Sequence, residues 1–447
     1  MKNQSSVVTL PKHTLSVLAS EIAERFSFFG LAAILPIFLK NHCYDDSETE
    51  AASVLHLWRS GVFFFPLFGA IIADVFLGKY RTILIGSLLC CIGHAILSIS
   101  IDNCVFFLVG IFLIAMSAGV IKSNVSPFLG DQIGEQFSTQ RGLLFNYLYL
   151  SINLGGGIAL LCVPYLRETY GNAIAFGVPG LAMFIALVVF VIPGKSYKKS
   201  KGVGVSEYKN LFSKKNLIGI KKSCTLFAFL IIYFMLFENY GGAWVYQAEK
   251  LDLNFWGYSF APDQMQSSNP ILIIILIPLF TGVLFPFLKK NYGIELSLFQ
   301  KIKIGFFLLI IAFVIIIFIQ VEIDKGRQPH AYWQLIAYFF LTASEVLVSV
   351  SCLQYAYEVA GPNVKSIVTA LFMLSTAFGN VLLSWLNTQI HSGNLNFLGV
   401  VEMDTKYYLL LLVLMALNSL AFFYFFSHTN YQQNTPTANP ATSDISP

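Results

Sequence analysis

About twelve stretches of this chain are long and apolar enough to cross a lipid bilayer as helices, since a spanning helix needs about 20 mostly apolar residues. Only 12% of the residues are charged and 56% are hydrophobic, and the mean hydropathy is +0.68. A soluble protein carries about 25% charged residues. We therefore expect an all-α membrane protein with spans near residues 15–40, 52–77, 81–101, 104–127, 141–164, 172–193, 223–247, 268–289, 297–320, 331–357, 365–387 and 405–427.

The distribution of Lys and Arg over the loops predicts the orientation. The longest polar interval, GKSYKKSKGVGVSEYKNLFSKKNLIGIKK, is rich in Lys, and the alternating loops on the opposite side, such as NHCYDDSETE, are acidic or mixed. Both termini are therefore expected in the cytoplasm. The expected organisation is a cytoplasmic segment, a six-helix bundle, a Lys-rich linker, a second six-helix bundle and a disordered cytoplasmic tail, at 1–14, 15–193, 194–222, 223–427 and 428–447.

The seven cysteines include no C-x-x-C pair and no spacing with His that is typical of a metal site. Most of them lie in apolar runs, where we expect them to pack as free thiols. Cys43 and Cys104 both fall near the predicted outer face. A bridge between these two is the alternative to free thiols.

Several ionisable side chains fall inside the apolar runs. A charge at the centre of a spanning helix costs about 2.5–3.5 kcal/mol, so the set would cost on the order of 15–20 kcal/mol if unpaired. A static ion pair is the alternative for each charge, but the charges occur in spans one, four, seven and ten. We expect them to face a shared wet cavity, where the excess of carboxyl groups indicates that some carry protons. These residues are Glu21, Glu24, Arg25, Lys122, Glu238 and Glu345.

Two bundles joined by a basic linker resemble the plan of the major facilitator transporters, which bind substrate at mid-membrane between the halves. The segment GAIIADVFLGKYRT after span two is similar to the signature of that superfamily. In span one, E-x-x-E-R-F resembles the hallmark of its proton-dependent oligopeptide transporter family. Segments that resemble the same family follow in order: IKSNVSPFLGDQ, FNYLYLSINLGGG, LFENYGGAWVYQAEKLD, QSSNP and LTASEVLVSVSCLQYAYEVAGPNVKS.

The family resemblance implies roles for the intramembrane residues. Arg25 and Lys122 would attract the carboxylate of a peptide, and Glu345 would hold its amino group with help from Asn153 and Asn269. The proton-responsive set would be Glu21, Glu24 and Glu238, with gating salt bridges Arg25–Glu238 and Lys122–Glu345 across the halves.

This chain departs from the family in its pocket. Phenylalanines stand where the family usually has pocket tyrosines or a tryptophan, so hydroxyl donors are lost, and Ser123 replaces a usual proline. His56 aligns with a span-two histidine that animal members use in proton coupling. The nearby Arg59 has no role implied by the resemblance; it would either act on His56 or reach the outer headgroups. The phenylalanines expected to line the substrate site are Phe28, Phe29, Phe63 and Phe234.

The expected function is therefore a proton-coupled symporter that imports di- and tripeptides by alternating access. The alternative is a proton-coupled symporter of another small amphoteric or anionic solute, such as an amino acid, nitrate or a peptide-like compound. An enzyme is not expected, because no H-E-x-x-H or G-x-S-x-G occurs in the sequence, and a sensor would need a large soluble output domain. We expect no metal and no cofactor, since the proton gradient drives transport. The expected partners are short peptides, protons and membrane lipids, without nucleic acid, for a monomer in the cell (inner or plasma) membrane.

Overall fold

The computed structural model describes residues 11–133, 141–202, 204, 214–360 and 365–426. Within these residues it is helical throughout, except for a short hairpin of β1 (Asn254–Phe255) and β2 (Tyr258–Ser259). The described residues contain 12 segments long and apolar enough to cross a membrane, which confirms the expected all-helical architecture. The orientation of the termini stays a prediction.

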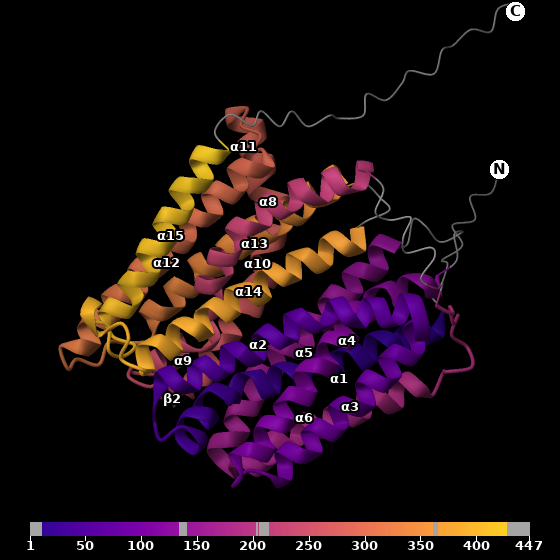
Figure 1. Cartoon of the computed structure of the whole chain (residues 1–447), viewed down its shortest axis with the longest axis horizontal. Coiled ribbons are helices and arrows are strands. Elements are labelled where there is room, and N and C mark those ends of the chain that lie inside the picture. Colours follow the sequence, from indigo (N-terminus) through magenta and orange to yellow (C-terminus); the bar gives the residue numbers. More distant parts are fainter. Residues whose placement is uncertain (1–10, 134–140, 203, 205–213, 361–364, 427–447) are drawn as a thin grey trace, which may run out of the picture.

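The first half of the chain forms one bundle (Figure 1), in which α1 packs against α5 and α6, and α4 packs against α2 and α3. Proline lies inside several of these helices, and π-helical turns η1 and η2 follow α1 and α2. The elements are α1 (Lys12–Phe38), η1 (Leu39–Cys43), α2 (Glu48–Ile71), η2 (Ile72–Leu77), α3 (Lys79–Ile99), α4 (Cys104–Gln132), α5 (Arg141–Tyr170) and α6 (Asn172–Val191).

The second half forms another bundle, in which α12 packs against α13 and α15, and α8 packs against α13 and α14. Two of its spans are broken into short segments. The elements are α8 (Lys214–Phe237), η5 (Glu238–Gly241), α9 (Ala243–Ala248), η6 (Pro262–Ser267), α10 (Ser268–Pro278), η7 (Leu279–Leu284), α11 (Phe285–Tyr292), α12 (Leu298–Asp324), α13 (Tyr332–Ala360), α14 (Lys365–His391), η9 (Asn396–Leu398) and α15 (Thr405–Phe425).

The seventh span is not a continuous α-helix. It changes to a 3₁₀ turn over Glu238–Gly241 and resumes as α9 after Gly242, whose φ of −133° and ψ of −96° lie outside the helical region. Glycine suits this position because a Cβ at Gly242 would lie 2.9 Å from Nε2 of His56 on α2. The break exposes backbone carbonyls in the middle of the protein, where side chains of other helices can reach them.

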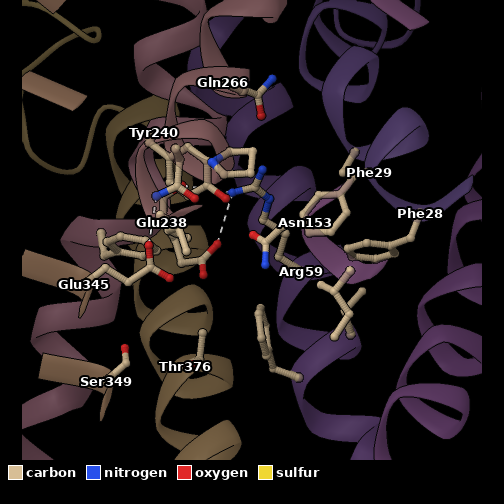
Figure 2. A pocket seen from close by; sticks show the side chains of 18 of the residues that line it. Phe28, Phe29, Arg59, Asn153, Glu238, Tyr240, Gln266, Glu345, Ser349 and Thr376 are labelled. Carbon is tan, nitrogen blue, oxygen red and sulfur yellow. Dashed lines mark hydrogen bonds and ion pairs between the residues drawn. The ribbon is translucent and has the colours of Figure 1, made fainter. Parts of the chain in front are cut away.

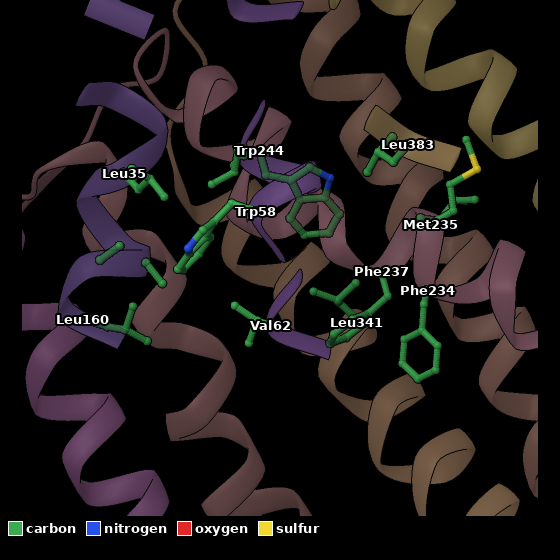
Figure 3. Close-up of a cluster of buried hydrophobic side chains, with 14 of the residues drawn as sticks. Leu35, Trp58, Val62, Leu160, Phe234, Met235, Phe237, Trp244, Leu341 and Leu383 are labelled. Carbon is green, nitrogen blue, oxygen red and sulfur yellow. The ribbon is translucent and has the colours of Figure 1, made fainter. Parts of the chain in front are cut away.

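The two bundles meet most extensively along α2 and α14. Figure 1 shows the helices of both halves converging at the end of the molecule where α9 and β2 lie. Buried apolar side chains from both halves lie together near this contact (Figure 3), among them Trp58 of α2 and Trp244 of α9. The indole of Trp58 donates to the carbonyl of Ile111 on α4 at 2.8 Å, which fixes α2 within its own bundle.

At the opposite end of the first bundle, α2, α3 and α4 are held together by the segment that resembles the facilitator signature. A Cβ added at Gly69 would lie 2.7 Å from the Val120 Cα, so only glycine permits this approach of α2 to α4. The Gly69 carbonyl accepts a bond of 3.1 Å from Asn124, and Lys79 pairs with Asp131 at 2.6 Å.

The expected domain limits stay predictions, but one helix boundary differs. The structure begins α8 at Lys214, within the stretch expected to be the linker. The last residues of that stretch, LIGI between basic residues, are apolar enough to extend the seventh span. The rest of the linker is described only in part, because residues 203 and 205–213 lie outside the described residues, as do 1–10 and the expected tail at 428–447.

Of the two alternatives left open for Cys43 and Cys104, the structure shows the bridge. The structure joins them in a disulfide between the end of η1 and the start of α4. The two cysteines are 61 positions apart in the sequence, and the helices between them place the start of α4 beside the end of η1. The remaining cysteines are free thiols: Cys90, Cys91, Cys162, Cys224 and Cys352.

Replacing Cys43 and Cys104 by serine should lower the free energy of unfolding by about 2–4 kcal/mol, because the disulfide restricts the unfolded chain. Thermal unfolding of the detergent-solubilised protein measures the change, with the exposed Cys162→Ser as the control. An unchanged midpoint in the double serine variant would contradict the bridge.

Candidate functional site

A cavity of about 430 Å³ lies between the two bundles and is lined by both (Figure 2). Helices α1, α2, α4 and α5 contribute from the first half, and α8, η5, η6, α10, α13 and α14 from the second. Of the residues predicted for the site, most line this cavity: Arg25, Phe28, Phe29, Phe63, Lys122, Asn153, Phe234, Glu238, Asn269 and Glu345. The other three, Glu21, Glu24 and His56, are buried beside it.

On α1, one guanidinium holds two carboxylates. The Nε of Arg25 lies 3.1 Å from Oε1 of Glu21 and 2.5 Å from Oε2 of Glu24. The spacing E-x-x-E-R places the three side chains together, because residues three and four apart are neighbours on a helix. The Nη2 of Arg25 is buried and has no hydrogen-bond partner among the described residues. The Nε edge of the Arg25 guanidinium is therefore occupied by two carboxylates. Its Nη2 donor has no partner among the described residues.

The position of Arg25 depends on a glycine of α5. A Cβ at Gly155 would overlap the carbonyl of Ile22 and lie 3.0 Å from the Cβ of Arg25. The INLGGG sequence thus lets α5 approach α1 at the level of the charged cluster. Two residues earlier, the amide of Asn153 donates to the carbonyl of Tyr149 at 2.9 Å, and its oxygen is left for other partners.

Lys122 lies on the cavity wall without a carboxylate. Its Nζ sits 4.2 Å from the centre of the Phe63 ring, a cation–π contact between α4 and α2. Within the described residues, no ion pair involves Lys122. The ammonium is therefore available to an anion that enters the cavity. The expected Lys122–Glu345 bridge is not formed in this structure.

Glu345 of α13 has neutral partners instead. Its Oε2 accepts a hydrogen bond of 2.8 Å from Asn269 of α10, and the same amide contacts Thr342 Oγ1 at 3.2 Å. In the described part of the chain, no cation pairs with Glu345. A carboxylate held by an amide keeps lone pairs for a further donor, such as an ammonium group.

The expected Arg25–Glu238 bridge is also not formed in this structure. Glu238 pairs with Arg59 of α2 at 3.1 Å, a residue that the sequence resemblance left without a role. The pairing follows from the helix break, since η5 brings Glu238 against α2, while α1 supplies two nearer carboxylates to Arg25. Arg59 is only 6% exposed and lines the cavity, so it does not reach the lipid headgroups.

His56, one turn before Arg59, contacts the second bundle. Its Nδ1 lies 2.9 Å from Oδ1 of Asn380 on α14, while the amide nitrogen of Asn380 donates to Thr376. Because Oδ1 can only accept, Nδ1 carries the hydrogen and Nε2 has the lone pair. That Nε2 is buried close to Gly242 and has no hydrogen-bond partner in the part of the chain that the structure describes. His56 therefore does not contact Arg59 through a hydrogen bond and instead joins the two halves.

The apolar lining consists mainly of aromatic rings. Phe28 stacks on Trp58 with ring centres 5.8 Å apart and packs edge-on against Phe29. On the other side of the cavity, Phe234 packs against Phe237 and Phe372. Sequence reasoning missed Trp58, Gln266 and Tyr240 as lining residues, because an apolar or amide side chain in a span gives no signal of which way it points.

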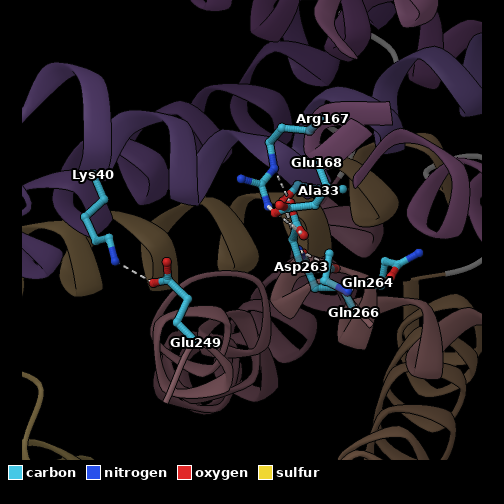
Figure 4. Close-up of polar contacts among 9 residues, drawn as sticks. Ala33, Lys40, Arg167, Glu168, Glu249, Asp263, Gln264 and Gln266 are labelled. Carbon is cyan, nitrogen blue, oxygen red and sulfur yellow. Dashed lines mark hydrogen bonds and ion pairs between the residues drawn. The ribbon is translucent and has the colours of Figure 1, made fainter. Parts of the chain in front are cut away.

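One end of the cavity is closed by polar contacts between the halves (Figure 4). Lys40 pairs with Glu249 at 2.5 Å, and Arg167 binds the fully buried Asp263 through two bonds of 3.1 and 3.2 Å. Gln266 donates to the Ala33 carbonyl at 3.1 Å. All these residues lie toward the ends of their helices that are nearest the Cys43–Cys104 bridge. The structure is therefore closed at the disulfide end.

The sequence was then compared with known families. It matches the PTR2 family model, described as the POT family, over residues 80–214 and 202–402, which is more than half of the chain. The chain belongs to the POT family. The expectation from the E-x-x-E-R-F resemblance is thus confirmed, and since POT proteins are transporters, so is the expectation that this is not an enzyme.

Among curated proteins, it is similar to solute carrier family 15 member 2 of Oryctolagus cuniculus, with 34% identity over 70% of this chain and 49% of the relative. Solute carrier family 15 member 1 of Homo sapiens is 32% identical over 73% of this chain and 54% of the relative. The chain therefore spans about half the length of these relatives.

Among solved structures, an auto-inhibited POT family peptide transporter superposes with a TM-score of 0.86 at 28% identity, covering 96% of this chain and 99% of the other. The POT family transporter PepTSo gives a TM-score of 0.84 at 28% identity, with coverage of 93% and 98%. Together with the 12 candidate spans, these similarities identify an integral multi-pass membrane protein.

Replacing Arg167 by alanine should destabilise the protein by about 3–5 kcal/mol, because it leaves the buried carboxylate of Asp263 without a counter-ion. Thermal unfolding measures the loss, and Arg167→Leu combined with Asp263→Leu should recover part of it. Glu168→Gln is the control, since Glu168 meets the same arginine from a 54% exposed position. A single variant as stable as the wild type would show that this pair does not hold the closed end.

Proposed function

We propose that this protein is a proton-coupled symporter that imports di- and tripeptides by alternating access. The observation that carries the proposal is the pair of cavity charges without an ionic partner among the described residues. One is the ammonium of Lys122 on the first bundle, and the other is the carboxyl of Glu345 on the second. A zwitterionic peptide offers the complementary charges at its two ends and would bridge the halves.

The peptide carboxylate would bind between Lys122 and Arg25. Arg25 is held on its Nε edge by Glu21 and Glu24, and its buried Nη2 has no partner among the described side chains. An unpartnered buried donor is costly, and a carboxylate that accepts from it removes that cost. The two glutamates would thus orient the arginine for the ligand as well as neutralise it.

The remaining lining suits a short peptide with apolar side chains. The cavity volume of about 430 Å³ lies within the usual range for small-ligand sites. Asn153 and Asn269 would bond to the peptide amides, and Asn269 also orients Glu345. The rings of Phe28, Phe29, Phe63 and Phe234 would take apolar side chains, so hydrophobic peptides should be preferred.

Protons would enter through the carboxyl groups, with Glu238, Glu21 and Glu24 as the responsive set and His56 beside them. A proton moving down the membrane potential gains about 2.3 kcal/mol per 100 mV, which can drive peptide accumulation. No cofactor is needed for this step. The bonds between the halves at the disulfide end would break when the cavity opens to that side.

We also propose the orientation of the chain. The Cys43–Cys104 bridge would lie outside the cell, because disulfides persist in oxidising compartments. The basic loops and both termini would then lie in the cytoplasm. The protein would act as a monomer in the lipid of the cell membrane.

The alternative is symport of another small amphoteric or anionic solute. Loss of the tyrosine hydroxyls from the pocket favours it, because fewer donors remain to recognise a peptide backbone. Competition of labelled dialanine uptake by single amino acids and by nitrate separates the two functions.

Lys122→Gln and Glu345→Gln should each raise the KM for dialanine at least tenfold, since a hydrogen bond to a charged group contributes about 1.5–3 kcal/mol. Uptake into proteoliposomes under an imposed pH gradient measures the change. The exposed Lys290→Gln is the control. Wild-type vesicles that take up no dialanine, or variants with an unchanged KM, would refute the proposed function.

A further inference from the structure

Arg59 is seated in the break of the seventh span by three separate bonds. Its Nη1 donates to the carboxylate of Glu238 at 3.1 Å and to the Glu238 backbone carbonyl at 3.0 Å, while Nη2 donates to the Gly241 carbonyl at 3.2 Å. The guanidinium also lies over the Tyr240 ring at 5.6 Å. A side chain of the first bundle therefore donates to two backbone carbonyls at the helix break in the second bundle, besides its ion pair with Glu238 (Figure 2).

We call the contact site of Arg59 on η5, formed by Glu238, Tyr240 and Gly241, the seat. Glycines beside it leave room for the side chains of α2. A Cβ added at Gly241 would overlap the Arg59 guanidinium, and a Cβ at Gly242 would lie 2.9 Å from Nε2 of His56. The two glycines thus let α2 insert Arg59 and His56 against η5. Arg59 and Glu238 are each about 6% exposed, so the contact is shielded from water on most sides.

We propose that Arg59 is a positioning residue that separates proton coupling from substrate binding in this protein. Arg59 serves as the counter-ion of Glu238 and holds α2 on the broken seventh span, which leaves Arg25 and Lys122 for the peptide carboxylate. This inference rests on the proposed function and concerns the same cavity.

In the proposed proton step, one group, the carboxylate of Glu238, binds the proton. A proton from water on the disulfide side binds a carboxylate oxygen of Glu238, which becomes neutral, and no covalent bond other than O–H forms. Arg59 then loses its charged partner and keeps only the two carbonyl bonds, which are weaker than a charge–charge bond. The closed end opens more easily, and a peptide can enter from the side that supplied the proton.

Other ionisable groups face this pair from the surrounding helices. Lys122 is a second cation near Glu238, Glu345 is a second carboxyl group near it, and Asn380 of α14 is a neutral neighbour. The charged and titratable groups around the pair are His56 on α2, Arg25 on α1, Lys122 on α4, Tyr240 on η5 and Glu345 on α13.

The first test is uptake of dialanine by proteoliposomes over a range of external pH. Arg59→Gln should reduce pH-gradient-driven accumulation at least tenfold and flatten the pH profile, while the KM for dialanine in counterflow exchange changes less than threefold. Arg59→Lys should be intermediate, because an ammonium can pair with Glu238 but cannot reach both carbonyls at once. An unaltered pH profile, or a KM raised tenfold as for a carboxylate-binding residue, would overturn the inference.

Two glycine variants separate the effect of the Arg59 contact site from the effect of the charges. Gly241→Ala keeps every charged group but blocks the guanidinium, so it should flatten the pH profile in the same way as Arg59→Gln. Gly282→Ala is the matched control, because a Cβ there has no described atom within 4 Å. Equal profiles for both alanine variants and the wild type would contradict the role of the seat.

The second test does not depend on transport. Spin labels at Asn41→Cys and Ser392→Cys, both exposed at the disulfide end on opposite bundles, report its opening when the exposed Cys162 and Cys224 are replaced by serine. Electron–electron distances should lengthen by more than about 2 Å as the pH falls from 7.5 to 5 with Arg59 present, as in a domain rearrangement. They should be long at both pH values in Arg59→Gln. Distances that do not change with pH in the labelled protein that keeps Arg59 would overturn the inference. If vesicles with the wild-type protein transport no peptide but these distances respond as expected, the proposed function is refuted. The role of Arg59 in closing the disulfide end is then still supported.

Discussion

The cost of placing charge inside a bilayer governs this structure. Each charged side chain in a span is tolerated only when it is paired or faces water. The chain meets this requirement by gathering Arg25, Arg59, Lys122, Glu238 and Glu345 around a cavity between the two bundles. Two features bring these charges together: glycines at the helix contacts, and the break in the seventh span. Both let the helices approach closely enough for the charged side chains to meet.

The charged side chains at that cavity are of two kinds: some are held in ion pairs, and others are available to a ligand. Arg25 is neutralised by two glutamates of its own helix, and Arg59 by a glutamate of the other bundle. Lys122 and Glu345 are left facing the cavity without ionic partners in the described residues. Under the proposed function, this division would let one site bind both a zwitterion and a proton, because Lys122 and Glu345 are not engaged in ion pairs among the described residues.

Much of this could be predicted from the sequence, because hydropathy marks the spans and charges in apolar runs are rare. The cavity-lining position of Lys122, far along the chain from Arg25, followed from that argument. The pairing could not be predicted, since Arg59 and Glu238 meet only through the break at Glu238–Gly241, and helix rotation decides which neighbours a side chain has. The Cys43–Cys104 bridge stayed an open alternative for a similar reason, as it depends on where two helix ends meet.

The most direct test of the central claim is the affinity of the purified wild-type protein for dialanine and its end-blocked forms, measured by calorimetry. If Lys122 and Glu345 recognise the two ends of a zwitterion, N-acetyl-dialanine and dialanine amide should each bind at least tenfold more weakly than dialanine. The penalty for the amide should vanish in Lys122→Gln, and the penalty for the acetyl group in Glu345→Gln. Blocked and free peptides that bind the wild type with equal affinity would contradict the account.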